Sequence, residues 1–156
     1  MPDQKNDPAK QNTTEHISVL TGASDEQDLM KTAISLQTIA AHFGFDWPDI
    51  APVFAKLDEE IQGLKHEVEQ SNISGKNALD NRKSIEDELG DVLFCCMNLA
   101  RFLKVDPAQA LQSTNNKFKR RFGFIESYVL QKGKKMQDLS LEELDKAWDL
   151  AKEKGL

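Results

Sequence analysis

The chain has 156 residues, of which 39% are hydrophobic and 29% charged, and its formal net charge is −6 at pH 7. This length and composition fit one globular domain and exclude collagen-like, low-complexity and wholly disordered chains. The acidic balance also argues against nucleic acid as the main partner, because a large basic surface is needed to neutralise a phosphate backbone.

No apolar run approaches the roughly 20 residues that span a bilayer, and the first residues lack the apolar core of a secretion signal. We therefore expect a cytoplasmic protein with no membrane partner. The two cysteines, Cys95 and Cys96, are neighbours in sequence, which fits neither a disulfide framework nor a C-x-x-C pair. They are predicted to be small core residues.

The predicted elements are helices. Residues 1–26 are polar and carry no apolar period, so they are expected to form a flexible tail, with residues 27–156 as the folded domain. Apolar steps of three and four, the Asp106-Pro107 pair, the glycines Gly44 and Gly133 and a Ser140–Glu143 capping box mark the helix limits. The expected helices cover about residues 26–43, 51–70, 78 or 84 to 103, 107–133 and 140–152. Since no long stretch alternates as a strand does, the predicted fold class is all-α, an antiparallel helical bundle.

The third of these helices carries two acids on its apolar side. At 100° per residue, Glu88 lies within about 40° of Val92 and Leu99, inside the apolar arc. Asp91 follows one turn later at the edge of the same arc. Two unpaired carboxylates in such a place are unfavourable, so the arrangement indicates a bound cation. The apolar side itself is expected to bury Ile85, Leu89, Val92, Cys96, Leu99 and Leu103.

A second acidic ridge lies on the helix before it. Glu59 and Glu60 flank the apolar stripe of that helix, and Glu67 comes two turns after Glu60. If the two helices pack antiparallel, Glu60 faces Glu88 and Asp91 and forms an all-oxygen site of the kind that Mg²⁺ prefers, completed by waters and substrate phosphates. The alternative at this point is that these acids are ordinary solvated side chains, above all Glu67. A di-iron bundle is disfavoured, because no histidine follows a glutamate at the Glu-x-x-His spacing.

A basic cluster lies on the fourth predicted helix. Lys117, Arg120 and Arg121 share one face at i, i+3 and i+4, while Phe118 and Phe122 anchor the helix. In an acidic chain such a cluster suits an anion, and arginine binds phosphate through two parallel hydrogen bonds. The alternative is a solvated basic face. Together with the acidic face, the cluster points to a phosphate ester bound through a metal.

These residues, taken in order, resemble the MazG family of nucleoside triphosphate pyrophosphohydrolases. The similarity covers about residues 39–152 and is to the C-terminal catalytic half of the two-domain bacterial MazG proteins. Its landmarks are Gly44-Phe45-Asp46-Trp47, Pro52-Val53, Lys56, Glu59-Glu60, Glu88-Leu89-Gly90-Asp91-Val92-Leu93-Phe94, Asn98-Leu99-Ala100-Arg101, Asn115, Lys117-Phe118, Arg120-Arg121-Phe122 and Trp148.

The resemblance implies roles for individual residues. The family pattern is E-E-x-x-E followed by E-x-x-D, whose acids hold Mg²⁺, with Mn²⁺ as a substitute. Carried over, the catalytic acids are Glu59, Glu60, Glu88 and Asp91, and the metal ligands are Glu60, Glu88 and Asp91, with Glu59 or Glu67 as a further ligand. The nucleotide-binding residues implied are Lys56, Asp87, Asp91, Lys117, Phe118, Arg120, Arg121 and Trp148. The family also implies a homodimer. The third glutamate of the first motif falls on Gly63 in this chain.

The resemblance thus predicts a Mg²⁺-dependent enzyme that cleaves a nucleoside triphosphate to a nucleoside monophosphate and pyrophosphate. For Trp148 the alternative is simple packing of the last helix. The alternative function is a nucleotide-binding or regulatory domain that was weakened catalytically by the loss of a metal ligand at Gly63. That second hypothesis predicts that Gly63→Glu restores activity.

Overall fold

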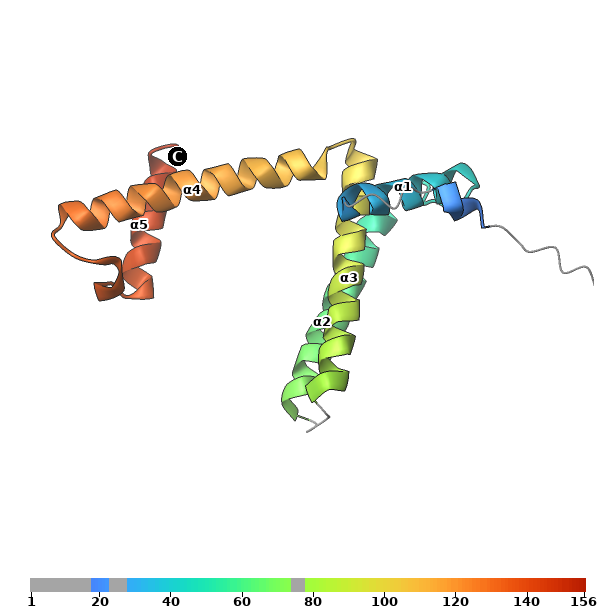
Figure 1. The fold of residues 1–156 in the computed structure, drawn as a ribbon, viewed down its shortest axis with the longest axis horizontal. Coiled ribbons are helices and arrows are strands. Elements are labelled where there is room, and N and C mark those ends of the chain that lie inside the picture. The colour runs from blue at the N-terminus through green and yellow to red at the C-terminus, as the bar shows by residue number, and fades with distance from the viewer. Residues whose placement is uncertain (1–17, 23–27, 74–77) are drawn as a thin grey trace, which may run out of the picture. The chain divides into compact units, whose positions relative to one another are not determined.

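The computed structural model describes residues 18–22, 28–73 and 78–156 (Figure 1). By its contacts the chain divides into two units, Met1–Asp46 and Trp47–Leu156. In chain order, the elements are the 3-10 helix η1 (Val19–Gly22), α1 (Leu29–His42), α2 (Ala51–Ile73), α3 (Ala78–Leu103), α4 (Pro107–Gln131), the 3-10 helix η2 (Met136–Asp138) and α5 (Leu141–Glu153). No strand forms in these described ranges. The predicted all-α class is therefore confirmed.

The predicted tail, residues 1–26, lies mostly outside the described residues. Its described part contains η1, which contacts α1, and in which the Ser18 carbonyl accepts a hydrogen bond from the Thr21 hydroxyl at 2.7 Å. The division at residue 26 stays a prediction. Among the described helices, none is both long enough and apolar enough to cross a bilayer.

Helix α1 is closed at both ends by local hydrogen bonds. The Asp28 carboxylate accepts from two free backbone N–H groups of the first turn at 3.2 and 3.3 Å, which holds the pKa of Asp28 below its ordinary value. At the other end, Gly44 has a φ of +84°, and its N–H and that of Phe45 donate to carbonyls of the last turn at 3.0 Å. A left-handed glycine with these two bonds is the Schellman motif. The expected glycine cap is confirmed.

Helices α2 and α3 pack along one another and run antiparallel (Figure 1). The prediction that the apolar stripe of α3 is buried holds only in part: Leu89 is 45% exposed and Leu103 is 55% exposed, and the other four residues of the stripe are half-buried. The physical reason is that the main helical neighbour of α3 in the described residues is α2. One neighbouring helix covers a narrower arc than this apolar stripe occupies.

Helices α4 and α5 form a second packed pair. The Asp106 carboxylate caps α4 with Pro107 at the first helical position, as predicted. The predicted capping box opens α5: Ser140 N–H donates to Glu143 Oε2 at 2.9 Å, and Glu143 N–H donates to Ser140 Oγ at 3.3 Å. The two helices enclose a small apolar core whose buried members are Ile125, Val129 and Ala147. This core fixes α5, and with it Trp148, on α4.

Candidate functional site

The α2–α3 pair brings Glu60 and Glu88 onto facing sides of two helices, with Asp91 exposed one turn after Glu88. Glu88 reaches across to α2, where a Cβ built on Gly63 would overlap Glu88 Oε2 and lie 3.0 Å from its Cδ. One turn further along each helix are Glu60 and Asp91, whose charges both raise the pKa of Cys95. In an antiparallel pair, a step of one turn toward the start of α2 corresponds to a step of one turn toward the end of α3. If Gly63 lies opposite Glu88, Glu60 therefore lies opposite Asp91. The orientation of Glu88 expected from the helix geometry agrees with this arrangement.

Cys95 lies on this acidic face as a half-buried free thiol. Burial raises the pKa of Cys95 above its ordinary value, and the nearby Glu60 and Asp91 carboxylates add to the rise. The Lys56 ammonium opposes them. The expectation that both cysteines are core residues holds only in part, because Cys95 and Cys96 are half-buried.

Lys56 is held by the first two acids of the motif. Its Nζ lies 2.8 Å from Glu59 Oε1 and 2.6 Å from Glu60 Oε1, and hydrogen bonds to these carboxylates raise the pKa of Lys56 above its ordinary value. The Glu60 side chain is 14% exposed, whereas that of Glu59 is 69% exposed. Glu60 therefore belongs to the helix interface, and Glu59 to the surface beside it.

The two remaining predicted acids, Asp87 and Glu67, make fewer contacts with the described residues. Asp87 is exposed on α3 and Glu67 is half-buried on α2. Neither side chain makes an ion pair within residues 18–22, 28–73 and 78–156. The geometry thus joins Glu60, Glu88 and Asp91 in one register, and leaves Asp87 and Glu67 at its margin.

The donor set of this face fits Mg²⁺. Carboxylate oxygens are the hard ligands that Mg²⁺ takes, and the ion commonly uses one or two of them together with waters and substrate phosphates. In the described part of the chain, no three His, Cys, Asp or Glu side chains are gathered as a ready metal cage. Glu60 and Asp91, together with Glu88 one turn away, supply enough carboxylates for a Mg²⁺ site in which substrate phosphates provide further ligands.

A second group of predicted residues meets where α5 packs on α4. The rings of Phe118 and Trp148 lie 5.3 Å apart, and those of Phe118 and Phe122 are stacked at 5.9 Å. The Arg121 guanidinium lies 5.4 Å from the centre of the Trp148 ring, and its Nε donates to the Leu156 carbonyl at 2.7 Å. The structure therefore joins Phe118, Arg121 and Trp148.

The other two cations of the basic cluster make no such contacts with the described residues. Lys117 and Arg120 are exposed on α4, and neither forms an ion pair with any residue that the structure describes. Arg121 thus has a structural partner, whereas Lys117 and Arg120 are the cations available to an anion.

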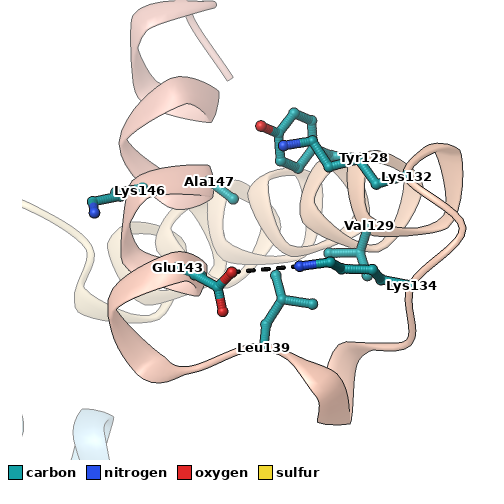
Figure 2. Close-up of a pocket in the computed structure, with 8 residues that line it drawn as sticks. All are labelled: Tyr128, Val129, Lys132, Lys134, Leu139, Glu143, Lys146 and Ala147. Atoms are coloured by element: carbon teal, nitrogen blue, oxygen red, sulfur yellow. Dashed lines mark ion pairs between the residues drawn. The ribbon is translucent and has the colours of Figure 1, made fainter.

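A small pocket of about 160 Å³ opens between the end of α4 and the first turns of α5 (Figure 2). Each of its lysines is engaged: Lys134 lies 3.6 Å from Glu143 and Lys146 2.7 Å from Glu142, while Lys132 lies over a tyrosine ring. None of the predicted site residues is among its lining, which consists of Tyr128, Val129, Lys132, Lys134, Leu139, Glu143, Lys146 and Ala147.

Sequence reasoning missed two features of the acidic face. It assigned Cys95 to the core, although its position one turn after Asp91 is a signal that the thiol shares the acidic side. It also treated Gly63 only as a missing glutamate, and nothing in the spacing indicates that Glu88 lies against that glycine. The contact depends on the register of two helices, which the pattern within one helix does not contain.

Comparison with known proteins identifies the segment that carries these acids. A family model described as the MazG nucleotide pyrophosphohydrolase domain matches residues 51–123, a range that contains α2, α3 and the basic cluster of α4. Residues 51–123 are thus similar to a MazG nucleotide pyrophosphohydrolase domain. Trp148 and the rest of α5 lie beyond the matched residues.

Curated relatives extend the similarity beyond that domain. The nucleoside triphosphate pyrophosphohydrolase/pyrophosphatase MazG of Thermotoga maritima is 37% identical over 123 residues, which are 79% of this chain and 44% of the relative. The nucleoside triphosphate pyrophosphohydrolase of Escherichia coli K12 is 37% identical over 120 residues, or 77% of this chain and 43% of the relative. The uncharacterized protein YabN of Bacillus subtilis is 47% identical over 70 residues, or 45% of this chain and 14% of the relative. The chain described here thus spans less than half the length of these relatives.

Proposed function

We propose that this chain hydrolyses nucleoside triphosphates between the α and β phosphates and releases a nucleoside monophosphate and pyrophosphate. The proposal is supported by the similarity of residues 51–123 to a MazG domain and by the names of the relatives from Thermotoga maritima and Escherichia coli. The observation that carries it is the register of the α2–α3 pair, in which Glu88 lies against Gly63 of α2, one turn from Glu60 on α2 and from Asp91 on α3.

Glu60, Glu88 and Asp91 are the residues proposed to hold Mg²⁺ or Mn²⁺, with Glu59 or Glu67 as a further ligand. When bound, such an ion supplies positive charge that polarises a phosphate oxygen. Among the glutamates of this set, Glu59 is the exposed one, so it is the residue we propose to orient the attacking water and accept its proton.

The α4–α5 group is proposed to bind the nucleotide. Lys117 and Arg120 are exposed cations without an ion-pair partner among the described residues, and they would offset the charge of the polyphosphate. Phe118 and Trp148 offer ring surface for the base or sugar. Arg121 holds the Trp148 ring and the Leu156 carbonyl, so we propose that it positions the aromatic group. Lys56 and Asp87 are proposed to border the nucleotide.

We also propose that the protein is a homodimer. The support is apolar surface on α3 that a single chain leaves exposed: Leu89 is 45% exposed, Leu93 is 56% exposed and Phe94 is 42% exposed. Leu89 and Leu93, at i and i+4, share one side of the helix, and Phe94 lies about 100° further around it. Light scattering after size-exclusion chromatography tests the proposal: a dimer mass is expected for the wild type, and a monomer mass for Leu93→Glu.

The activity is tested by pyrophosphate release over a panel of canonical and modified nucleoside triphosphates, with and without Mg²⁺. Glu60→Gln and Asp91→Asn keep the side-chain shape and remove one charge each. We expect each to lower turnover about 100-fold or more, because the bound metal ion stabilises the transition state by several kcal/mol. Glu69→Gln is the matched control, because Glu69 is an exposed acid on the same α2 helix. Release of orthophosphate in place of pyrophosphate would contradict the proposed bond cleavage.

The alternative, a nucleotide-binding domain with little catalysis, makes a different prediction in the same assay. Nucleotide would bind without turnover, and Gly63→Glu would restore turnover by supplying the missing family ligand. The position of Glu88 against Gly63 bears directly on this second hypothesis.

A further inference from the structure

Gly63 differs from the other helix-interior glycines in what surrounds it. A Cβ built there would overlap Glu88 Oε2, lie 3.0 Å from Glu88 Cδ and lie 3.4 Å from its second carboxylate oxygen. At Gly90 in α3 and Gly123 in α4, a Cβ would meet nothing within 4 Å. The space beside Gly63 is therefore already filled, and the group that fills it is the Glu88 carboxylate.

The identity of that group sets the consequence of adding a side chain. A carboxylate is the far end of a flexible side chain, so a new Cβ at residue 63 displaces Glu88 at a cost that is measurable but smaller than the gain in helix propensity. Glycine within a helix is itself less stable than alanine by about 1 kcal/mol. A substitution at Gly63 therefore acts on the placement of Glu88 and leaves the α2–α3 pair intact.

We propose that Gly63 is a positioning residue, whose missing side chain forms a slot on α2 that holds the Glu88 carboxylate one turn from Glu60 and Asp91. This inference rests on the proposed function, because it concerns the cation site of that function. In it, an acid from α3 occupies the space from which the third glutamate of the family motif would project on α2. Adding a glutamate at residue 63 then displaces a ligand that is already in place.

The direct test compares Gly63→Ala with Gly123→Ala, the matched control. Both replace a helical glycine, so both are expected to raise the melting temperature, by about 2–4 °C for full helix gain. Mn²⁺ affinity, measured by electron paramagnetic resonance on the protein without nucleotide, should fall about 10- to 100-fold for Gly63→Ala and stay unchanged for Gly123→Ala. Equal Mn²⁺ affinity in the two variants would overturn the positioning role.

A second measurement needs no metal. Gly63→Ala is made in the wild-type background and in a Glu88→Ala background, and the gains in melting temperature are compared. If the carboxylate fills the slot, the gain is larger without Glu88, since nothing has to move. Equal gains in the two backgrounds would overturn the slot itself. Absence of Mn²⁺ binding by the wild type would instead overturn the proposed cation site, so the two failures are distinguishable.

The Gly63→Glu variant distinguishes the positioning role of Gly63 from the alternative that the site has simply lost one metal ligand. We expect its Mn²⁺ affinity to stay at or below that of the wild type, because its Cβ displaces Glu88 as the Cβ of alanine does. A rise in Mn²⁺ affinity together with a rise in turnover would overturn the inference and favour a site that simply lacks one glutamate.

Discussion

Replacing Ile125 by alanine tests how α5, and with it Trp148, is held on α4. Ile125 is 3% exposed and packs in a core whose other buried members are Val129 and Ala147. The substitution removes three buried carbons, which corresponds to roughly 2.4 kcal/mol at about 0.8 kcal/mol each. The residual cavity adds to this loss, and the higher helix propensity of alanine returns about 0.4 kcal/mol. We expect unfolding free energy to fall by about 2–4 kcal/mol.

The assay is urea unfolding in a Trp47→Phe background, which leaves Trp148 as the only tryptophan of the chain. Loosening of α5 should shift the Trp148 emission to the red, because the ring loses its contacts with Phe118 and Arg121. If these residues bind the nucleotide, its affinity should fall in parallel.

Leu130→Ala is the matched control for Ile125→Ala. Leu130 lies on the same helix but is 76% exposed, so its truncation should change the unfolding free energy by less than about 0.5 kcal/mol. Similar losses from the two variants, or an unchanged Trp148 emission in Ile125→Ala, would refute the reasoning that this small core fixes α5.

Three further predictions follow from local geometry. Lys104 has a φ of +54° just after α3, so Lys104→Gly should raise the unfolding free energy by about 0.5–1 kcal/mol in urea titrations, and Lys104→Ala should not. The Ser140 N–H and Lys134 lower the pKa of Glu143 below its ordinary 4.5; its stabilising contribution is complete above that value and lost as the pH falls through the lowered pKa. The urea midpoint should therefore drop on acidification, and the drop should be smaller in Glu143→Gln; an equal drop in the two proteins would contradict this role. In a Cys96→Ser background, iodoacetamide should alkylate Cys95 only at high pH, and Glu60→Gln should speed the reaction by lowering the pKa of Cys95; an unchanged rate would contradict the placement of Glu60 beside the thiol.

The helix limits were largely readable in the sequence because they are set by local chemistry. Asp106 before Pro107, the Ser140–Glu143 box and the left-handed glycines at residues 44 and 133 act within one turn of backbone. Such caps need no partner from elsewhere in the chain. The same local logic indicated that Glu88 points toward a neighbouring helix.

The sequence was less reliable where a second element decides the outcome. Periodicity marked Leu89 and Leu103 as core, yet both are exposed, because a stripe shows which side of a helix is apolar and not how much of it a neighbour covers. The spacing of Arg121 likewise gave no sign of its partners in the structure, the Leu156 carbonyl and the Trp148 ring; its role toward phosphate stays a prediction.

By itself, then, the sequence determined the all-α class, the caps and the set of acids, since all three depend on spacings within one helix. Only the tertiary structure decided that Glu60 and Asp91 share the surroundings of Cys95 and that the Glu88 carboxylate fills the space beside Gly63. The reason is physical: the register between α2 and α3 is set by how their whole surfaces pack, and a shift of one turn would place different side chains opposite each other while leaving every pattern in the sequence unchanged.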